Sequence, residues 1–376
     1  MTALPRPEID ENGLLEFSVV YTDRALNHMS QKFQTALRDI SATLKKVYRA
    51  QHTAIIPGSG TSGMEAVARQ FARGQKCLVV RNGFFSYRWS QILETGHIAS
   101  ETRVLTARQN DAPQAPFSPA PIEEVCAEIA AFRPSVVFAP HVETASGIML
   151  PDTYIARLAE AVHSVGGLLV IDCIASGCVW LDMEKLGIDI LISAPQKGWS
   201  GSPCCGLVML NSEAAARLEH TQSDSFALDL KKWLNIMQAF ENGGHAYHAT
   251  PPTDALLQLD KVMKEAEAVG FELLRERQLE LGRKIRTLLV ENGFPSVAAE
   301  GFEAPGVVVS YTSNPAVQSG KAFIEQGVQT ASGVPLQCGE RSDFRTFRLG
   351  LFGLDKLADV DATVACFAEV LEKIGR

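Results

Sequence analysis

Short apolar runs alternate with amphipathic stretches through the middle of the chain. The runs predict buried strands at residues 76–80, 135–139, 168–171 and 188–193. Between them, apolar residues recur at helical spacing and predict helices at residues 64–72, 122–132 and 153–165. Buried strands joined by helices of this length are typical of βαβ units, in which a parallel sheet is covered on both faces. We therefore expect an α/β fold with a mostly parallel central sheet.

The pattern changes near residue 253. A long charged helical segment is expected at 254–291, interrupted at Gly270 and Gly282. Shorter elements follow, namely strands at 306–311 and 346–349 and helices at 320–326 and 358–374. They indicate a second, smaller α+β domain. The predicted division is an N-terminal arm at 1–20, a large domain at 21–260 and a small C-terminal domain at 261–376.

Composition narrows the class of protein. With 46% hydrophobic and 21% charged residues the chain is a folded globular protein rather than a disordered one. The net charge of −8, without a long basic stretch, predicts no nucleic-acid partner. The apolar segments are shorter than the roughly 20 residues of a membrane helix, and the N-terminus lacks the order of a signal peptide, so we expect no membrane partner. Eight scattered cysteines without a CxxC pair indicate reduced thiols in a cytoplasmic protein and no metal site.

A glycine-rich segment, Gly58-Ser59-Gly60-Thr61-Ser62-Gly63, precedes the first predicted helix. Glycines let the backbone approach an anion, and a helix N-terminus offers unpaired N–H groups, so the segment suits a phosphate. A turn that ends in a Ser or Thr helix cap explains the same residues. Because no Gly-Lys-Ser/Thr follows, the segment is not the phosphate loop of a nucleotide-binding enzyme.

Two further candidates follow predicted strands. Asp172 comes directly after the apolar run 168–171, where open α/β sheets bind ligands, although it could equally cap a turn. Lys197 follows the run 188–193 in a stretch of low charge, where a lysine can be a neutral, nucleophilic amine, although most lysines are solvated surface groups. An acid, a lysine and a phosphate cradle at strand ends are together what pyridoxal 5′-phosphate requires.

The order of these motifs resembles the class V aminotransferases of fold type I, the group that includes alanine–glyoxylate and serine–pyruvate aminotransferases. The resemblance extends from about residue 25 to residue 376. It implies a pyridoxal-phosphate enzyme that transfers an amino group from a small L-amino acid, such as alanine or serine, to a 2-oxo acid such as glyoxylate or pyruvate.

The resemblance implies how the cofactor phosphate is bound. Ser59, Gly60 and Thr61 match the phosphate loop of the family. Tyr247 and Thr250, in the segment Tyr-His-Ala-Thr-Pro-Pro, match residues that reach the phosphate of the neighbouring subunit. A homodimer with shared active sites follows from this likeness.

The cofactor ring has matching residues as well. By resemblance, Lys197 is the Schiff-base lysine and Asp172 pairs with the pyridine nitrogen, so these two are the catalytic residues. Ile174 presses on one ring face, and Gln196 lies near the cofactor phenolate or phosphate. Phe85 stands where the family commonly has a stacking Trp; a buried core ring is the other interpretation.

Two more segments resemble motifs of the family. The segment 141–147 resembles one that lies beside the cofactor, where Thr144 takes the polar contact, while His141 is more simply a core histidine. Arg348, in Phe-Arg-Leu-Gly, matches the arginine that binds the substrate α-carboxylate, a task that suits a bidentate guanidinium.

One segment departs from the family, because residues 17–24 lack its Gly-Pro-rich opening, which lines the substrate pocket. Arg24, Arg341 and Arg345 are candidates for a second substrate carboxylate, and surface positions are the simpler interpretation of all three. The identity of the donor and of the acceptor is therefore left open.

Two other functions were weighed. Cys338 lies ten residues before Arg348 (348 − 338 = 10), where a cysteine desulfurase or related lyase places its nucleophile. Those enzymes usually have His before the lysine, whereas this chain has Gln196, and an incidental thiol is the simpler interpretation. A non-catalytic binding protein of the same fold is the second alternative, disfavoured by the intact Lys197 and Asp172.

Overall fold

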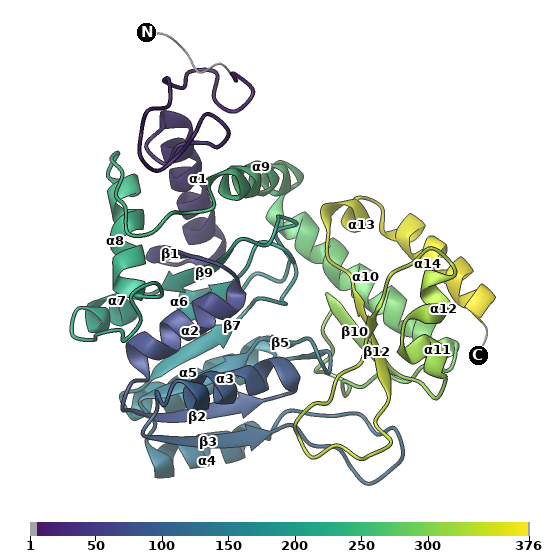
Figure 1. The fold of residues 1–376 in the computed structure, drawn as a ribbon. Helices are drawn as coiled ribbons and strands as arrows, with labels where there is room; N and C mark the ends of the chain where they lie inside the picture. Colours follow the sequence, from purple (N-terminus) through teal and green to yellow (C-terminus); the bar gives the residue numbers. More distant parts are fainter. Residues whose placement is uncertain (1–5, 375–376) are drawn as a thin grey trace.

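The computed structural model describes residues 6–374, in which a large sheet with its helices lies beside a smaller sheet with its own helices (Figure 1). The strands of the large sheet follow the order β1-β9-β8-β7-β4-β2-β3. Only β9 runs against the others, because both of its pairings, with β1 and with β8, are antiparallel while β2, β3, β4, β7 and β8 pair in parallel. The predicted α/β class with a mostly parallel sheet is confirmed.

The strands of the large sheet are short and buried. Their bounds are β1 His52–Pro57, β2 Lys76–Arg81, β3 Glu101–Thr106, β4 Val136–Pro140, β7 Leu168–Asp172, β8 Ile190–Ser193 and β9 Cys205–Leu210. A two-stranded ribbon, β5 Val142–Glu143 and β6 Ile148–Met149, follows β4. Alternate residues of β7 enter separate hydrophobic cores, Leu169 and Ile171 on one face and Leu168 and Val170 on the other. Burial on both faces explains why these strands are apolar throughout.

Helices cover both faces of the large sheet (Figure 1). One core is completed by α1 Gln31–Tyr48, α4 Ile122–Phe132, α5 Asp152–Ser164, α6 Met183–Leu186 and α9 Thr253–Val269. The opposite core is completed by α2 Gly60–Phe71, α3 Phe84–Thr95 and α7 Ser212–Leu218, and α8 Leu230–Glu241 contributes to both.

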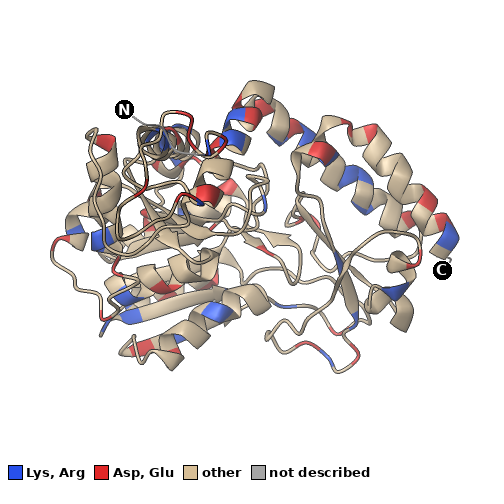
Figure 2. Ribbon diagram, turned by 45° about the horizontal axis from the view of Figure 1, so that its top comes forward, with Lys and Arg blue, Asp and Glu red and all other residues tan. Residues whose placement is uncertain are grey.

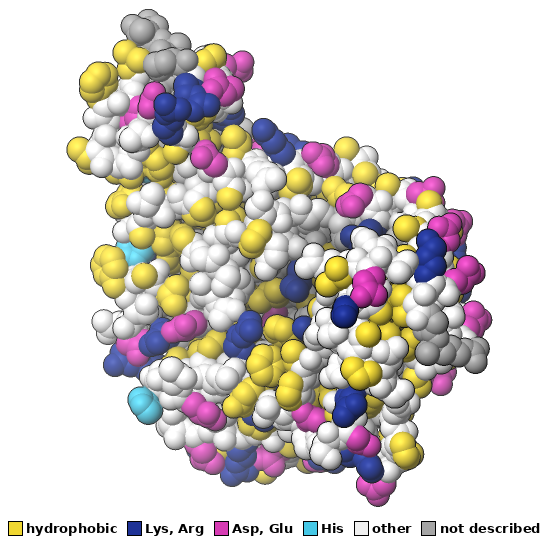
Figure 3. Space-filling view, turned by 45° about the vertical axis from the view of Figure 1, so that its right-hand side comes forward, with side chains coloured by type: hydrophobic (Ala, Val, Ile, Leu, Met, Phe, Trp, Pro, Cys, Tyr) yellow, Lys and Arg dark blue, Asp and Glu magenta, His cyan; other side chains and the backbone are white. Residues whose placement is uncertain are grey.

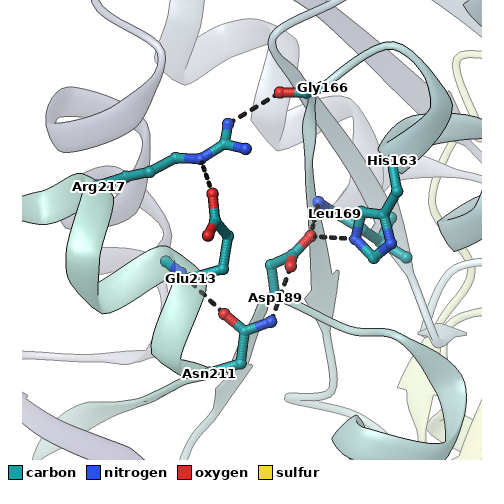
Figure 4. A network of polar contacts seen from close by, with 8 residues as sticks. His163, Gly166, Leu169, Asp189, Asn211, Glu213 and Arg217 are labelled. Carbon is teal, nitrogen blue, oxygen red and sulfur yellow. Dashed lines mark hydrogen bonds and ion pairs between the residues drawn. The ribbon is translucent and has the colours of Figure 1, made fainter.

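A buried carboxylate, Asp189, joins three elements of the large part (Figure 4). Its Oδ2 atom accepts a hydrogen bond from the Leu169 backbone at 2.7 Å and lies 2.9 Å from Nε2 of His163. Its Oδ1 atom accepts from the Asn211 side chain at 2.8 Å, and Asn211 in turn caps α7. The carboxylate therefore fixes the start of β8 against β7, α5 and α7.

The smaller part is built on the antiparallel sheet β10-β12-β11. Its elements are α10 Phe271–Glu291, β10 Val307–Tyr311, α11 Pro315–Gln318, α12 Lys321–Ile324, β11 Ala331–Ser332, β12 Thr346–Gly350, α13 Leu354–Ala358 and α14 Val360–Ile374. The predicted break at Gly270 is confirmed, but the one at Gly282 is wrong, since α10 continues through it. A Cβ on Gly282 would lie 2.4 Å from Cα of Pro305, so this glycine serves a close packing contact.

The predicted domain division stays a prediction. Residue 260 lies inside α9, which is tied to α1 because Lys264 bonds both Asp260 and Asp39. Basic and acidic residues are interspersed along the outer helices (Figure 2). No helix within residues 6–374 is long and apolar enough to cross a membrane.

The first described residues, up to about residue 30, form loops and turns above α1. Several of their hydrophobic side chains are exposed, among them Leu14, Phe17 and Val19. Figure 3 shows this segment as a projection from the rest of the surface, with hydrophobic side chains on it. Exposed apolar groups gathered in one segment are typical of a surface that contacts another protein.

Candidate active site

The predicted site residues lie at one edge of the large sheet. The strands β1, β2, β4, β7 and β8 run in the same direction and end there. Ser59, Phe85, Thr144 and Lys197 lie in the segments that follow β1, β2, β4 and β8, and Asp172 is the last residue of β7. Ligands of open α/β sheets bind outside the carboxyl ends of the strands. The fold therefore collects residues that are far apart along the chain.

The glycine-rich segment forms the N-terminus of α2, where Ser59 is the N-cap and Gly60 and Thr61 begin the helix. The first N–H groups of a helix have no carbonyl acceptor in a preceding turn, so they can bind an anion. A Cβ on Gly60 would lie 2.5 Å from Cδ1 of Ile174, and the missing side chain lets the loop after β7 approach the helix. Ile174 and the predicted phosphate loop are thus in contact.

Asp172 ends β7 and is 7% exposed. Its Oδ1 atom accepts from the Ile174 backbone at 2.8 Å, and no hydrogen-bond partner of Oδ2 is found within residues 6–374. Burial raises the pKa of Asp172 to about 6, and Glu143 adds to this shift, whereas Arg88 and Lys197 oppose it. An acid held in this way is ready to pair with a cationic ligand atom.

Lys197 lies in the loop after β8 and is half-buried. Its Nζ atom lies 5.3 Å from the centre of the Phe352 ring, and it makes no ion pair among the described residues. Burial lowers the pKa of Lys197; Asp172 works against this shift, and Arg348 and Arg88 reinforce it. A lowered pKa increases the neutral, nucleophilic fraction of the amine.

These residues fit pyridoxal phosphate by their chemistry. An amine with a lowered pKa and a buried acid lie within electrostatic range of each other, and each lacks an ion-pair partner in the part of the chain described. The N-terminus of α2, with no side chain at Gly60, adjoins the loop that carries the acid. The donor set thus offers an amine for an aldehyde, an acid for a ring nitrogen and N–H groups for a phosphate.

Two arginines flank Phe85 at the N-terminus of α3. The guanidinium carbon of Arg348, on β12, lies 5.6 Å from the ring centre, and that of Arg88, on α3, lies 5.2 Å from it. Nε of Arg348 donates to the Ser332 carbonyl at 2.9 Å, and burial lowers its pKa while Glu143 opposes the shift. The smaller part therefore brings a guanidinium to the predicted cofactor residues.

Glu143 holds the start of α3 and was given no role from the sequence. Its fully buried carboxylate accepts from the Phe85 backbone at 3.1 Å, from the Ser86 backbone at 2.8 Å and hydroxyl at 2.6 Å, and from the Ala145 backbone at 2.9 Å. A carboxylate at a helix N-terminus is favoured by the helix dipole. The sequence signal of Glu143 is its place in the segment 141–147, which resembles a segment that lies beside the cofactor in the family.

The remaining predicted cofactor residues lie as follows. Thr144 is half-buried in the turn between β5 and β6, and Gln196 is exposed beside Lys197. Tyr247 and Thr250 lie in an exposed loop between α8 and α9, with their hydroxyl oxygens 3.0 Å apart. They are accessible to another subunit, and their role stays a prediction.

His141 is buried with Nδ1 2.7 Å from the Ser176 hydroxyl, and burial lowers its pKa to about 3, as befits a neutral core histidine.

The three arginines considered for a second carboxylate lie elsewhere. Arg24 is exposed near the N-terminus. Arg341 pairs with Asp343 at 3.1 Å, and both line a cavity of about 290 Å³ together with Arg345. None of the predicted cofactor residues lines that cavity. Besides Arg348, the fold brings Arg88 to the site, three residues after Phe85 on the same helix.

Comparison with known proteins agrees with this geometry. The family model described as aminotransferase class-V matches residues 12–338. A 2-aminoethylphosphonate–pyruvate transaminase of Pseudomonas aeruginosa is 29% identical over 329 residues, covering 86% of this chain and 83% of the relative. The soluble hydrogenase small subunit of a Synechococcus species is 24% identical over 381 residues, covering 100% and 94%. The solved alanine–glyoxylate aminotransferase of a Nostoc species has the same fold, with a TM-score of 0.78 at 19% identity over 92% of this chain and 88% of that one.

Proposed function

Because this chain belongs to the class-V aminotransferase family, and is a pyridoxal-phosphate-dependent transaminase, we propose that it moves the amino group of a small L-amino acid to a 2-oxo acid such as pyruvate or glyoxylate. One observation carries the assignment of residues. Lys197 and Asp172, each without an ion-pair partner within residues 6–374, are electrostatically coupled beside the N-terminus of α2.

Lys197 is proposed as the nucleophile and the proton carrier. The cofactor, when bound, supplies an aldehyde for covalent attachment and a ring that withdraws the electron pair left when the substrate Cα loses its proton. Burial favours the neutral Nζ atom of Lys197, which can attack a carbonyl and can accept the proton from Cα. One amine thus performs both tasks in turn.

Asp172 is proposed to hold the ring nitrogen through its free Oδ2 atom. A positive partner favours the ionised carboxylate, and in a buried position this interaction is stronger than in water. Ile174 and Phe85 are proposed to enclose the ring, with Gln196 and Thr144 beside it. Ser59, Gly60 and Thr61 are proposed to receive the phosphate at the start of α2.

Arg348 is proposed to orient the substrate by its α-carboxylate. Within residues 6–374 the one hydrogen bond of the Arg348 side chain is from Nε to the Ser332 carbonyl, which leaves the terminal nitrogens for a paired contact.

The protein is further proposed to be a homodimer that works in the cytoplasm. Tyr247 and Thr250 are exposed and bonded to each other, which suits residues that complete a neighbour's phosphate site. The exposed apolar side chains within residues 14–20, namely Leu14, Leu15, Phe17, Val19 and Val20, offer additional contact surface. All eight cysteines lie in the described part as free thiols, in keeping with a reducing compartment.

The test of the enzyme is spectral. Purified protein with added pyridoxal phosphate should show the absorbance of a lysine-bound cofactor, and Lys197→Ala should lose it, whereas Lys185→Ala, which changes an exposed lysine on α6, should keep it. A small amino acid should then convert the spectrum, and a 2-oxo acid should restore it; 2-aminoethylphosphonate is tested as a further amino donor because a relative is named for it. A protein that takes up no cofactor, or whose spectrum no donor changes, would refute the proposal.

The shared site has its own test. A Lys197→Ala chain and a Tyr247→Phe/Thr250→Val chain should each be impaired, whereas their mixture after subunit exchange should regain activity through hybrid dimers. A monomer in solution, or no gain on mixing, contradicts the shared site and leaves the transaminase assignment intact.

The lyase alternative is not favoured by the structure. The Cys338 thiol lies 3.5 Å from the Arg81 carbonyl and 3.6 Å from the Leu336 carbonyl. Burial raises the pKa of Cys338 to about 12, and Glu143 and Glu340 add to the shift. A nucleophilic cysteine needs the opposite environment, one that stabilises its thiolate.

A further inference from the structure

Arg88 reaches from α3 to the helix that carries the predicted phosphate loop. Its Nη1 atom donates a hydrogen bond to Oγ1 of Thr61 at 2.9 Å. Thr61 is the second residue of α2, immediately after Gly60. Because Oγ1 accepts this bond, the hydroxyl hydrogen of Thr61 remains free to donate to a ligand.

The charge of Arg88 is not neutralised by the protein. Among the ion pairs within residues 6–374 none involves Arg88, although it is half-buried. Arg69, near the end of α2, shows the ordinary arrangement, in which Glu65 lies at 2.7 Å and Asp224 at 2.9 Å. A half-buried guanidinium without an acid lacks the partner that such groups usually have.

The position of Arg88 is set by contacts on both sides. Glu143 anchors the first turn of α3, and the guanidinium lies over the ring of Phe85. The charge of Arg88 lowers the pKa of Lys197 and opposes the rise in that of Asp172, so it lies within electrostatic range of both. The arginine therefore belongs to the site and is held there before any ligand binds.

We propose that Arg88 is the charged anchor of the cofactor phosphate, binding the phosphate oxygens with its remaining N–H groups while it holds Thr61 in place. The proposal rests on the proposed function. Planar guanidinium groups match phosphate oxygens in pairs, and the dipole of α2 favours the same anion. A dianionic group would supply the missing countercharge.

An acidic side chain of the substrate is the competing ligand for Arg88. The bond to Thr61 favours the phosphate, because it directs the guanidinium to the start of α2. Arg348, which reaches the Phe85 ring from β12, is already available for the substrate carboxylate.

The experiment compares two ligands on the apoprotein, namely pyridoxal phosphate and pyridoxal, which lacks the phosphate. Arg88→Gln should weaken binding of pyridoxal phosphate about 10- to 100-fold, the range for charge-assisted hydrogen bonds, and change that of pyridoxal less than about threefold. Inorganic phosphate should raise the melting temperature of the wild-type apoprotein but not that of Arg88→Gln. Arg88→Lys should keep part of the wild-type preference for pyridoxal phosphate over pyridoxal. Arg69→Gln, on the same helix as the phosphate loop, should keep all of this preference.

Each other result has a distinct meaning. If Arg88→Gln weakens the binding of pyridoxal phosphate and of pyridoxal equally, Arg88 only supports the fold. If Arg88→Gln binds pyridoxal phosphate in preference to pyridoxal as strongly as wild type does, Arg88 does not bind the phosphate. Either result overturns the proposal. Normal cofactor binding with a raised KM for acidic donors alone would assign Arg88 to the substrate instead. If wild-type protein binds neither ligand, the proposed function itself fails, which is distinguishable from failure of Arg88→Gln alone.

Discussion

Replacing Asp172 by Asn should stabilise the protein when no cofactor is bound. Burial raises the pKa of this carboxyl from 3.8 to about 6, so the ionised form is unfavourable in the folded apoprotein. At 1.36 kcal/mol per pKa unit, this amounts to roughly 3 kcal/mol of unfolding free energy. Asn keeps an oxygen that can accept from the Ile174 backbone, but it carries no charge.

The effect should depend on pH in one direction. Because the folded pKa is the higher one, the native state binds more protons than the unfolded state between about pH 4 and pH 6. Stability contributed by the protonated carboxyl is therefore complete below that window and lost as the pH rises through it. The advantage of Asp172→Asn should be near zero at about pH 4, roughly half of its maximum at pH 5 and complete above about pH 7.

Urea unfolding of the apoproteins at several pH values measures this difference. Asp189→Asn is the matched control, a second buried aspartate in the neighbouring strand segment (Figure 4). Its oxygens accept from Leu169 and Asn211, so an amide there should cost about 1–3 kcal/mol. An Asp172→Asn protein that is no more stable than wild type above pH 7, or equally stabilised at every pH, would refute the reasoning.

Two further substitutions test neighbouring parts of the site. Glu143→Gln should lower the unfolding free energy by about 1–3 kcal/mol, because an amide NH₂ would face some of the N–H and O–H donors that the carboxylate accepts. Cofactor titration should show weaker binding as well, and unchanged stability would contradict the anchoring role. Arg348→Gln should lower kcat/KM for the amino donor about 10- to 100-fold while the cofactor absorbance stays as in wild type. A loss of cofactor in that variant would instead place Arg348 among the cofactor residues.

Much of the fold was predictable because its strands are buried on both faces. The predicted helix at 122–132 and the strands at 76–80 and 168–171 correspond to α4, β2 and β7 within a residue. The helix at residues 31–48 is not among the predicted elements, although Phe33, Leu37, Ile40 and Leu44 have helical spacing behind the capping Ser30.

Other features carried no local signal. The reversed direction of β9 depends on its pairing with β1 and β8, since its residues are as apolar as those of a parallel strand. The continuity of α10 through Gly282 depends on Pro305, which packs against that glycine from 23 residues further along the chain (305 − 282 = 23). Contacts of this kind are invisible to a pattern read along the sequence.

The sequence by itself determined the α/β class and the order of motifs that indicates the family, because hydrophobic periodicity and residue spacing are properties of the chain. It also indicated Asp172 and Lys197, since each comes shortly after an apolar run that predicts a strand. Only the tertiary structure decided the surroundings of these two groups, because burial and neighbouring charges shift their pKa values. Glu143 contacts Ser86, 57 residues away along the chain, and Arg88 contacts Thr61, 27 residues away. Electrostatic interactions depend on distance and burial in space, and the sequence specifies neither until the chain has folded.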